Sequence, residues 1–111
     1  MSETSVAEIE GLQQAIDVLV AGFDPLRIIL FGSHARGDAS TSSDIDLLVV
    51  LPKMGHKRHT MGAMLDALAS LPVVVDPVPT DPAEIERRGD LAGDVLRPAL
   101  REGRVVYERA A

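Results

Sequence analysis

The spacing of apolar residues along the chain predicts alternating helices and strands. In residues 5–23, apolar side chains recur at three- and four-residue steps, which places them in one stripe along a helix. Residues 28–31 form a short apolar run with the length of a strand, and a second strand is expected at 44–51. The unbroken apolar stretch that begins at Leu47 predicts that this second strand is central and covered on both faces. The later elements are expected as a helix at 56–71, a β-branched strand at 73–76, a short helix from 81, a helix at 91–101 and a strand at 104–108.

The helix at 56–71 and the strand after it carry two further expectations. The strand at 73–76 is expected to end in Asp76, directly before Pro77. Five apolar residues form the expected buried stripe of the helix: Met61, Met64, Leu65, Leu68 and Leu71.

The composition is that of an ordinary globular domain, with 111 residues of which 46% are hydrophobic and 25% charged. No linker or repeat divides the chain, so one domain is expected over residues 1–111. The chain has no cysteine, which excludes disulfides, zinc–thiolate sites and thiol catalysis. No apolar stretch reaches the length of a membrane span, and no basic, apolar leader begins the sequence. We therefore expect a cytoplasmic protein without membrane contact.

The negative net charge limits the kinds of molecule that we expect the chain to bind. A formal net charge of −6 argues against sequence-independent nucleic-acid binding, which depends on Lys and Arg. A mononucleotide needs no broad basic surface, and an acidic protein favours a cationic protein partner.

The most specific chemical pattern joins a Gly-Ser pair to two aspartates. Gly32 follows the strand at 28–31, where glycine permits a sharp turn close to a ligand, and Ser33 opens a helical turn whose amides attract phosphate. Asp44 and Asp46 begin the next strand and project from one face, because side chains alternate along a strand. Two such carboxylates repel each other unless a cation lies between them, and Mg²⁺ combines carboxylates with phosphate oxygens. The pattern predicts a site for a metal-bound phosphate ligand.

The two aspartates have two other possible interpretations. A calcium-binding loop beginning at Asp38 fails, because Ser43 and Val49 stand where such a loop needs glycine and glutamate. The remaining alternative makes Asp44 and Asp46 solvated carboxylates at the entrance of a strand.

The cations near this pattern have two interpretations each. Arg36 either reaches back to a phosphate or forms a surface ion pair with Asp38. His34 is expected to be an exposed turn residue rather than a catalytic base. The cationic cluster at 56–59 is either a solvated start of a helix or a contact for the partner or the triphosphate.

The sequence Gly32-Ser33, ten residues and Asp44-Ile45-Asp46 resembles the motif of the nucleotidyltransferase superfamily related to DNA polymerase beta. The whole chain resembles a minimal nucleotidyltransferase domain. This resemblance implies an α/β fold with a small mixed β-sheet flanked by helices. It also implies ATP or another nucleoside triphosphate on Gly32 and Ser33, and two Mg²⁺ ions held by Asp44, Asp46 and a third acid.

Asp76 resembles that third acid in placement, because it lies on the strand that follows the Asp-x-Asp strand. Its role would be to complete the metal site or to accept a proton from the attacking hydroxyl. The alternative is a strand-end carboxylate in a turn with Pro77.

The resemblance implies a function as well. Domains of this kind are often paired with a HEPN ribonuclease toxin and transfer AMP to its tyrosine hydroxyl, which would make this chain an enzymatic antitoxin in a hetero-oligomer. One alternative keeps the chemistry and modifies the 3′ end of tRNA. Another is an antitoxin that neutralises its partner by binding alone.

Overall fold

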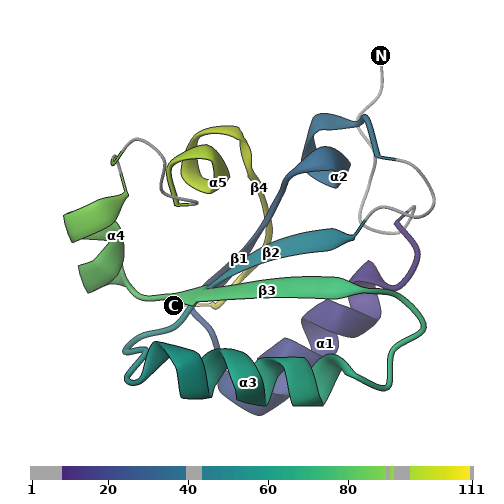
Figure 1. The fold of residues 1–111 in the computed structure, drawn as a ribbon, viewed down its shortest axis with the longest axis horizontal. Helices are drawn as coiled ribbons and strands as arrows, with labels where there is room; N and C mark the ends of the chain where they lie inside the picture. The colour runs from purple at the N-terminus through teal and green to yellow at the C-terminus, as the bar shows by residue number, and fades with distance from the viewer. Residues whose placement is uncertain (1–8, 40–43, 90, 92–95, 111) are drawn as a thin grey trace.

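The computed structural model describes residues 9–39, 44–89, 91 and 96–110, and within these residues the strands form one mixed sheet. The strand order is β3–β2–β1–β4 (Figure 1). β1 is antiparallel to both β2 and β4, whereas β2 and β3 are parallel. The strands are β1 (Arg27–Phe31), β2 (Ile45–Val50), β3 (Val75–Thr80) and β4 (Arg104–Glu108). The expected α/β class with a small mixed sheet is confirmed.

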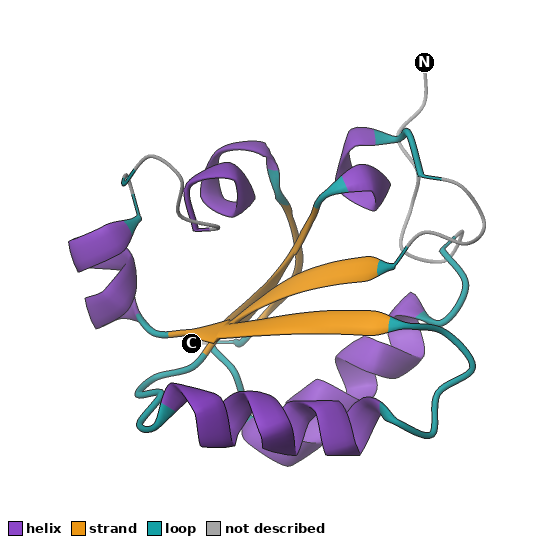
Figure 2. Ribbon diagram, viewed as in Figure 1, coloured by secondary structure: helices purple, strands orange, loops and turns teal. Residues whose placement is uncertain are grey.

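Helices cover both faces of this sheet (Figure 2). α1 and α3 lie side by side under one face and α5 lies over the other, while α2 follows the end of β1 and packs its Ala35 against the core formed with α1 and α3. The helices are α1 (Leu12–Phe23), α2 (Ser33–Arg36), α3 (Lys57–Leu68), α4 (Pro82–Arg88) and α5 (Leu96–Glu102). In the part of the chain that the structure describes, no helix has the length and apolar character needed to cross a bilayer.

The central strand β2 is buried on both faces, as its unbroken apolar run predicted. Leu47 and Val49 belong to the core formed with α1 and α3, whereas Leu48 and Val50 belong to a second core formed with α5. Since side chains alternate along a strand, Asp46 lies on the α5 side of the sheet with Leu48.

The first helix is shorter than its apolar periodicity predicted. It begins at Leu12 because Gly11 has a left-handed backbone, with φ of 82°, that cannot continue a helix. Ile9 still packs in the core, so the apolar spacing extended beyond the helix itself. The predicted start at residue 5 lies outside the described residues.

Two other predicted boundaries also move. α3 ends at Leu68 rather than at residue 71, and within its expected stripe Leu65 is 46% exposed. α3 packs against β3, which is the edge strand of the described sheet. No further described strand lies beyond β3 to cover the outer side of α3, and Leu65 is therefore exposed. The helix predicted at 91–101 is described only as α5, which ends at Glu102 rather than at residue 101, and residues 92–95 lie outside the described part.

β3 continues through two prolines, so its predicted end at Asp76 is wrong. Ile45 donates its N–H to the carbonyl of Val74 at 3.0 Å, and Leu51 donates to Thr80 at 2.8 Å, which directs the backbone groups of even-numbered residues toward β2. Pro77 and Pro79 therefore occupy positions whose missing N–H would point away from the sheet. Proline is tolerated in an edge strand for this reason.

The buried carboxylate of Glu84 lies where the parallel strands β2 and β3 end, and it connects these strands to α3 and α4. Glu84 is only 7% exposed and accepts hydrogen bonds from Thr80 Oγ1 at 2.6 Å and from Lys57 Nζ at 3.0 Å. Asp81 caps α4 by accepting from the Glu84 N–H, and its second oxygen accepts from the Met54 N–H at 3.0 Å. These contacts fix the loop between β2 and α3, so this end of the sheet is a structural junction.

Candidate active site

The candidate site is built on the close approach of Gly32 to Asp46. Gly32 follows β1, has φ of 76° and ψ of −155°, and lies where β1 gives way to α2. A Cβ at this position would run into Oδ2 of Asp46 and lie 3.2 Å from its Cγ. Both the backbone conformation and the space next to the carboxylate thus require glycine. The turn and the Asp-x-Asp segment, which the sequence places apart, are in direct contact.

Asp76 lies next to Asp46 in the sheet. The two residues are register partners in the parallel pairing of β2 and β3, and partners in register project from the same face. Adjacent strands are about 4.8 Å apart, which places the two carboxylates within reach of a common ligand. Asp44 precedes β2 and is exposed at the same end of the sheet.

The electrostatics of this group are unfavourable for three bare carboxylates. Burial raises the pKa of Asp46, and the charges of Asp76 and Asp44 raise it further, whereas His34 and Arg36 lower it. The negative charges of the carboxylates therefore repel one another, and a bound cation would reduce this repulsion. The predicted set Asp44, Asp46 and Asp76 lies together at the start of the parallel strands.

This donor set fits Mg²⁺ in its chemistry. Hard carboxylate oxygens beside a phosphate-binding turn are what Mg²⁺ uses, since it takes one or two carboxylates and completes its shell with water and phosphate oxygens. Among the residues that the structure describes, no three acidic, His or Cys side chains are arranged to hold a metal by themselves. Phosphate oxygens would have to supply part of the shell, so the metal assignment stays a prediction.

α2 places Ser33, His34 and Arg36 beside the carboxylates. It is a single helical turn, in which the Ala35 and Arg36 N–H groups both donate to the Gly32 carbonyl at 3.1 Å. Arg36 pairs through Nε with Asp38 at 3.3 Å, so the predicted ion pair is present. The charge of Arg36 also acts on Asp46, which keeps it near the site.

His34 was expected to be an exposed turn residue, and that prediction is wrong. His34 is half-buried and close enough to Asp46 to lower the pKa of that carboxyl. Its position after Ser33 in a one-turn helix over the sheet brings it there. The sequence offered no separate pattern for this contact, because the short helix has no periodicity to assign a face.

The cationic cluster at 56–59 lies away from the candidate site. α3 begins after β2 ends, so the cluster is at the opposite end of the parallel strands from Asp46 and Asp76 (Figure 1). Lys57 binds Glu84 there, and the rings of His56 and His59 stack with their centroids 4.2 Å apart. The cluster therefore does not reach a triphosphate bound at Gly32.

The comparisons with known proteins agree with this geometry. The nucleotidyltransferase domain family matches residues 12–98. A Methanocaldococcus jannaschii protein named "putative protein adenylyltransferase" is 31% identical over 93 residues, which cover 79% of this chain and 62% of that protein's length. This chain thus aligns with less than two thirds of that relative.

Two solved structures share the fold. The crystal structure of a Sulfolobus solfataricus protein described as a "putative nucleotidyltransferase" has a TM-score of 0.65 at 21% identity, and the match covers 94% of this chain and 83% of that chain. The structure of a protein described as a "putative minimal nucleotidyltransferase" has a TM-score of 0.51 at 30% identity, and the match covers 94% of this chain and 98% of that chain. The fold expected from the sequence is confirmed.

Proposed function

Because this chain belongs to the nucleotidyltransferase domain family, we propose that it is a Mg²⁺-dependent enzyme that transfers AMP from ATP to a hydroxyl of a partner protein. The observation that carries this proposal is the contact of Gly32 with Asp46 next to Asp76. It joins a phosphate-binding turn to carboxylates of the kind that bind Mg²⁺. The name of the M. jannaschii relative supports a protein as the acceptor.

Each residue of the site has a separate role in the proposed reaction. The Ser33 N–H and hydroxyl hold the phosphates beside Gly32, and Arg36 supplies positive charge. The acceptor oxygen forms a bond to the α-phosphorus, the bond from that phosphorus to the bridging oxygen breaks, and pyrophosphate leaves. Asp76 accepts the proton of the acceptor hydroxyl. Asp44 and Asp46 would hold Mg²⁺, which would supply positive charge to the triphosphate.

The acceptor in this proposal is a tyrosine of a HEPN-type ribonuclease toxin. AMP on that tyrosine would block the toxin, so the chain would act as its antitoxin within a hetero-oligomer. The similarity to a minimal nucleotidyltransferase supports this choice, and the net charge of −6 favours a cationic protein over RNA.

The test is the intact mass of a co-expressed HEPN-type ribonuclease after incubation with the purified chain, ATP and Mg²⁺. The wild type is compared with the double variant Asp44→Asn and Asp46→Asn. The matched control is Asp17→Asn with Asp66→Asn, which removes two exposed carboxylates from α1 and α3.

The proposal predicts a mass gain of one or more AMP units with the wild type and the control, and none with the Asp44 and Asp46 variant. A gain that survives in that variant would refute the metal assignment. A stable complex without any gain would instead identify neutralisation by binding, and transfer to tRNA would be the next reaction to assay.

A further inference from the structure

Arg36 is held by a carboxylate on the same short segment that carries the phosphate-binding turn. Its Nε donates to Oδ2 of Asp38 at 3.3 Å, and its charge also acts on Asp46. We propose that Asp38 is a positioning residue, which orients the guanidinium of Arg36 so that its Nη groups donate to the triphosphate. This inference rests on the proposed function, in which Arg36 supplies positive charge beside Ser33.

The backbone fixes Asp38 against the phosphate-binding turn. Gly37 ends α2 with φ of 84° and turns the chain back, as glycine does at the end of many helices. The N–H of Asp38 then donates to the carbonyl of Ser33 at 3.1 Å. The N–H of Arg36 donates to the carbonyl of Gly32, also at 3.1 Å. The carboxylate and the guanidinium therefore both stand on backbone that is hydrogen-bonded to the turn itself.

The contact with Asp38 uses one side of the guanidinium and leaves the other side available. A guanidinium carries N–H donors on Nε and on both Nη nitrogens. Among the described residues, the side-chain hydrogen bond between Arg36 and Asp38 comes from Nε. Both Nη nitrogens can thus donate to phosphate oxygens, and two parallel N–H donors are the arrangement in which arginine binds phosphate.

The expected effect of this contact is on ligand binding rather than on the stability of the fold. A long side chain loses rotamer freedom when a ligand fixes it, and this loss weakens binding. A carboxylate that already holds Nε removes part of the loss before ATP binds. The ion pair is exposed, with 50% of the Arg36 side chain and 62% of the Asp38 side chain accessible, so it contributes little to the free energy of unfolding.

A carboxylate near a triphosphate also has an opposite effect, and the two effects differ in sign. Charge alone predicts that removal of Asp38 strengthens ATP binding, because one repulsion is lost. Positioning predicts that removal of Asp38 weakens ATP binding. The weakening depends on Arg36, so without Arg36 only the loss of repulsion should remain.

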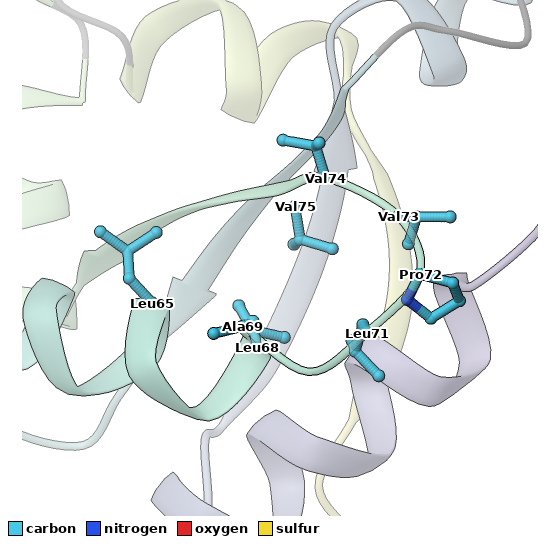
Figure 3. Close-up of a pocket in the computed structure, with 8 residues that line it drawn as sticks. All are labelled: Leu65, Leu68, Ala69, Leu71, Pro72, Val73, Val74 and Val75. Atoms are coloured by element: carbon cyan, nitrogen blue, oxygen red, sulfur yellow. The ribbon is translucent and has the colours of Figure 1, made fainter.

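Two other features of the described surface do not supply the phosphate contact. The apolar pocket between α3 and β3 lies on the face of the sheet opposite to Asp46, because Leu68 and Val75 of its lining belong to the core formed with α1 and α3 (Figure 3). No charged side chain lines this pocket. The cationic cluster at 56–59 is at the other end of the parallel strands. Neither feature can replace Arg36 at Ser33.

The experiment measures the binding of an ATP analogue with a methylene group between the α- and β-phosphorus, which cannot transfer AMP. Isothermal titration in Mg²⁺ compares the wild type with Asp38→Ala, Arg36→Ala and the double variant, and urea unfolding checks that each variant is folded. Glu108→Ala is the matched control, because Glu108 pairs with Arg27 at 3.7 Å and these side chains are 64% and 47% exposed. That pair lies at the start of β1, whereas Gly32 follows the end of the strand.

Asp38→Ala should weaken binding of the analogue about fivefold, the factor expected when one more side chain has to be ordered on binding. In the Arg36→Ala background the same change should leave binding unchanged or strengthen it. In AMP transfer, Asp38→Ala should raise the KM for ATP at unchanged kcat, because the phosphate contact is made before and during the reaction. Glu108→Ala should behave as the wild type in both measurements.

Binding of the analogue to Asp38→Ala that equals or exceeds binding to the wild type overturns the positioning role and leaves AMP transfer standing. A loss of equal size in the Arg36→Ala background also overturns it, because Asp38 would then act without Arg36. If the wild type does not bind the analogue, the positioning role and the proposed function both fail. Binding that follows the predicted pattern without any AMP on the partner refutes the transfer proposal alone.

Discussion

Replacing Gly32 by alanine tests the contact on which the site is built. The added methyl group meets the end of the Asp46 side chain, and alanine must adopt φ of 76° with ψ of −155°. Two separate costs follow from the structure. One is backbone strain, and the other is displacement of the carboxylate from its place next to Asp76.

The size of each cost can be given from the geometry. A non-glycine residue in this region of backbone conformation costs about 1–3 kcal/mol. Rotation of the Asp46 side chain off its preferred position adds about 1 kcal/mol. Gly32→Ala should therefore lower the free energy of unfolding by about 2–4 kcal/mol. Displacement of a reacting group by about 1 Å costs on the order of 100-fold in rate, so AMP transfer should fall by at least that factor.

Gly37→Ala is the matched control. Gly37 ends the same short helix with φ of 84°, and a Cβ there meets nothing within 4 Å. This variant carries strain without the clash and should cost about 1–2 kcal/mol, with AMP transfer changed only a few-fold. Urea unfolding followed by circular dichroism measures both variants, since the chain has no tryptophan for a fluorescence assay.

A double-mutant cycle isolates the clash from the strain. In the background of Asp46→Ala the carboxylate is absent, so Gly32→Ala should cost about 1 kcal/mol less than it does in the wild type. Two results together would refute the close approach of Gly32 to Asp46. The stability costs of Gly32→Ala and Asp46→Ala would be additive, and the Gly32→Ala variant would be no less stable than the Gly37→Ala variant.

Other variants test the charges at the two ends of the sheet. Asp46→Asn should raise the free energy of unfolding at neutral pH by about 0.5 kcal/mol in the presence of EDTA. Burial and the neighbouring carboxylates raise the pKa of Asp46, so this advantage should disappear as the pH falls below 3.8; a variant less stable than the wild type at pH 7 would contradict it. Lys57→Met should cost about 2 kcal/mol in thermal or urea unfolding, because it leaves buried Glu84 without its counter-charge, and the 40% exposure of the lysine side chain keeps the cost below that of a fully buried pair. Asp81→Ala should cost about 1–2 kcal/mol at pH 7. Hydrogen bonds from the Met54 and Glu84 N–H groups lower the pKa of Asp81, so the stability it adds is present above pH 3.8 and is lost as the pH falls through the lowered pKa; a pH-independent difference would contradict this role.

Local features of the sequence were sufficient to predict much of the fold. The apolar runs located β1 and β2, and the spacing from Ser33 to Asp44 was enough to expect the turn and the carboxylates at one end of the sheet. β4 follows its predicted range because glycine and β-branched residues delimit it. These elements are set by neighbouring residues, so their pattern could be recognised without tertiary information.

Features that depend on the position of an element in the fold were not predictable in this way. Proline ended β3 in the prediction, because nothing local reveals that a strand is at the edge of a sheet. Leu65 has core spacing and yet is exposed, because α3 lies under that same edge. The Lys57–Glu84 contact joins residues far apart in the chain, so no periodicity indicates it.

The central claim is that this chain transfers a nucleotide and not a phosphate group. The most direct measurement incubates the wild type and the Asp44→Asn, Asp46→Asn variant with Mg²⁺, the co-expressed partner and ATP labelled at either the α- or the γ-phosphate. AMP transfer predicts that the partner acquires label from the α-phosphate only, and only with the wild type. Label from the γ-phosphate, or equal labelling by the wild type and the variant, would contradict it.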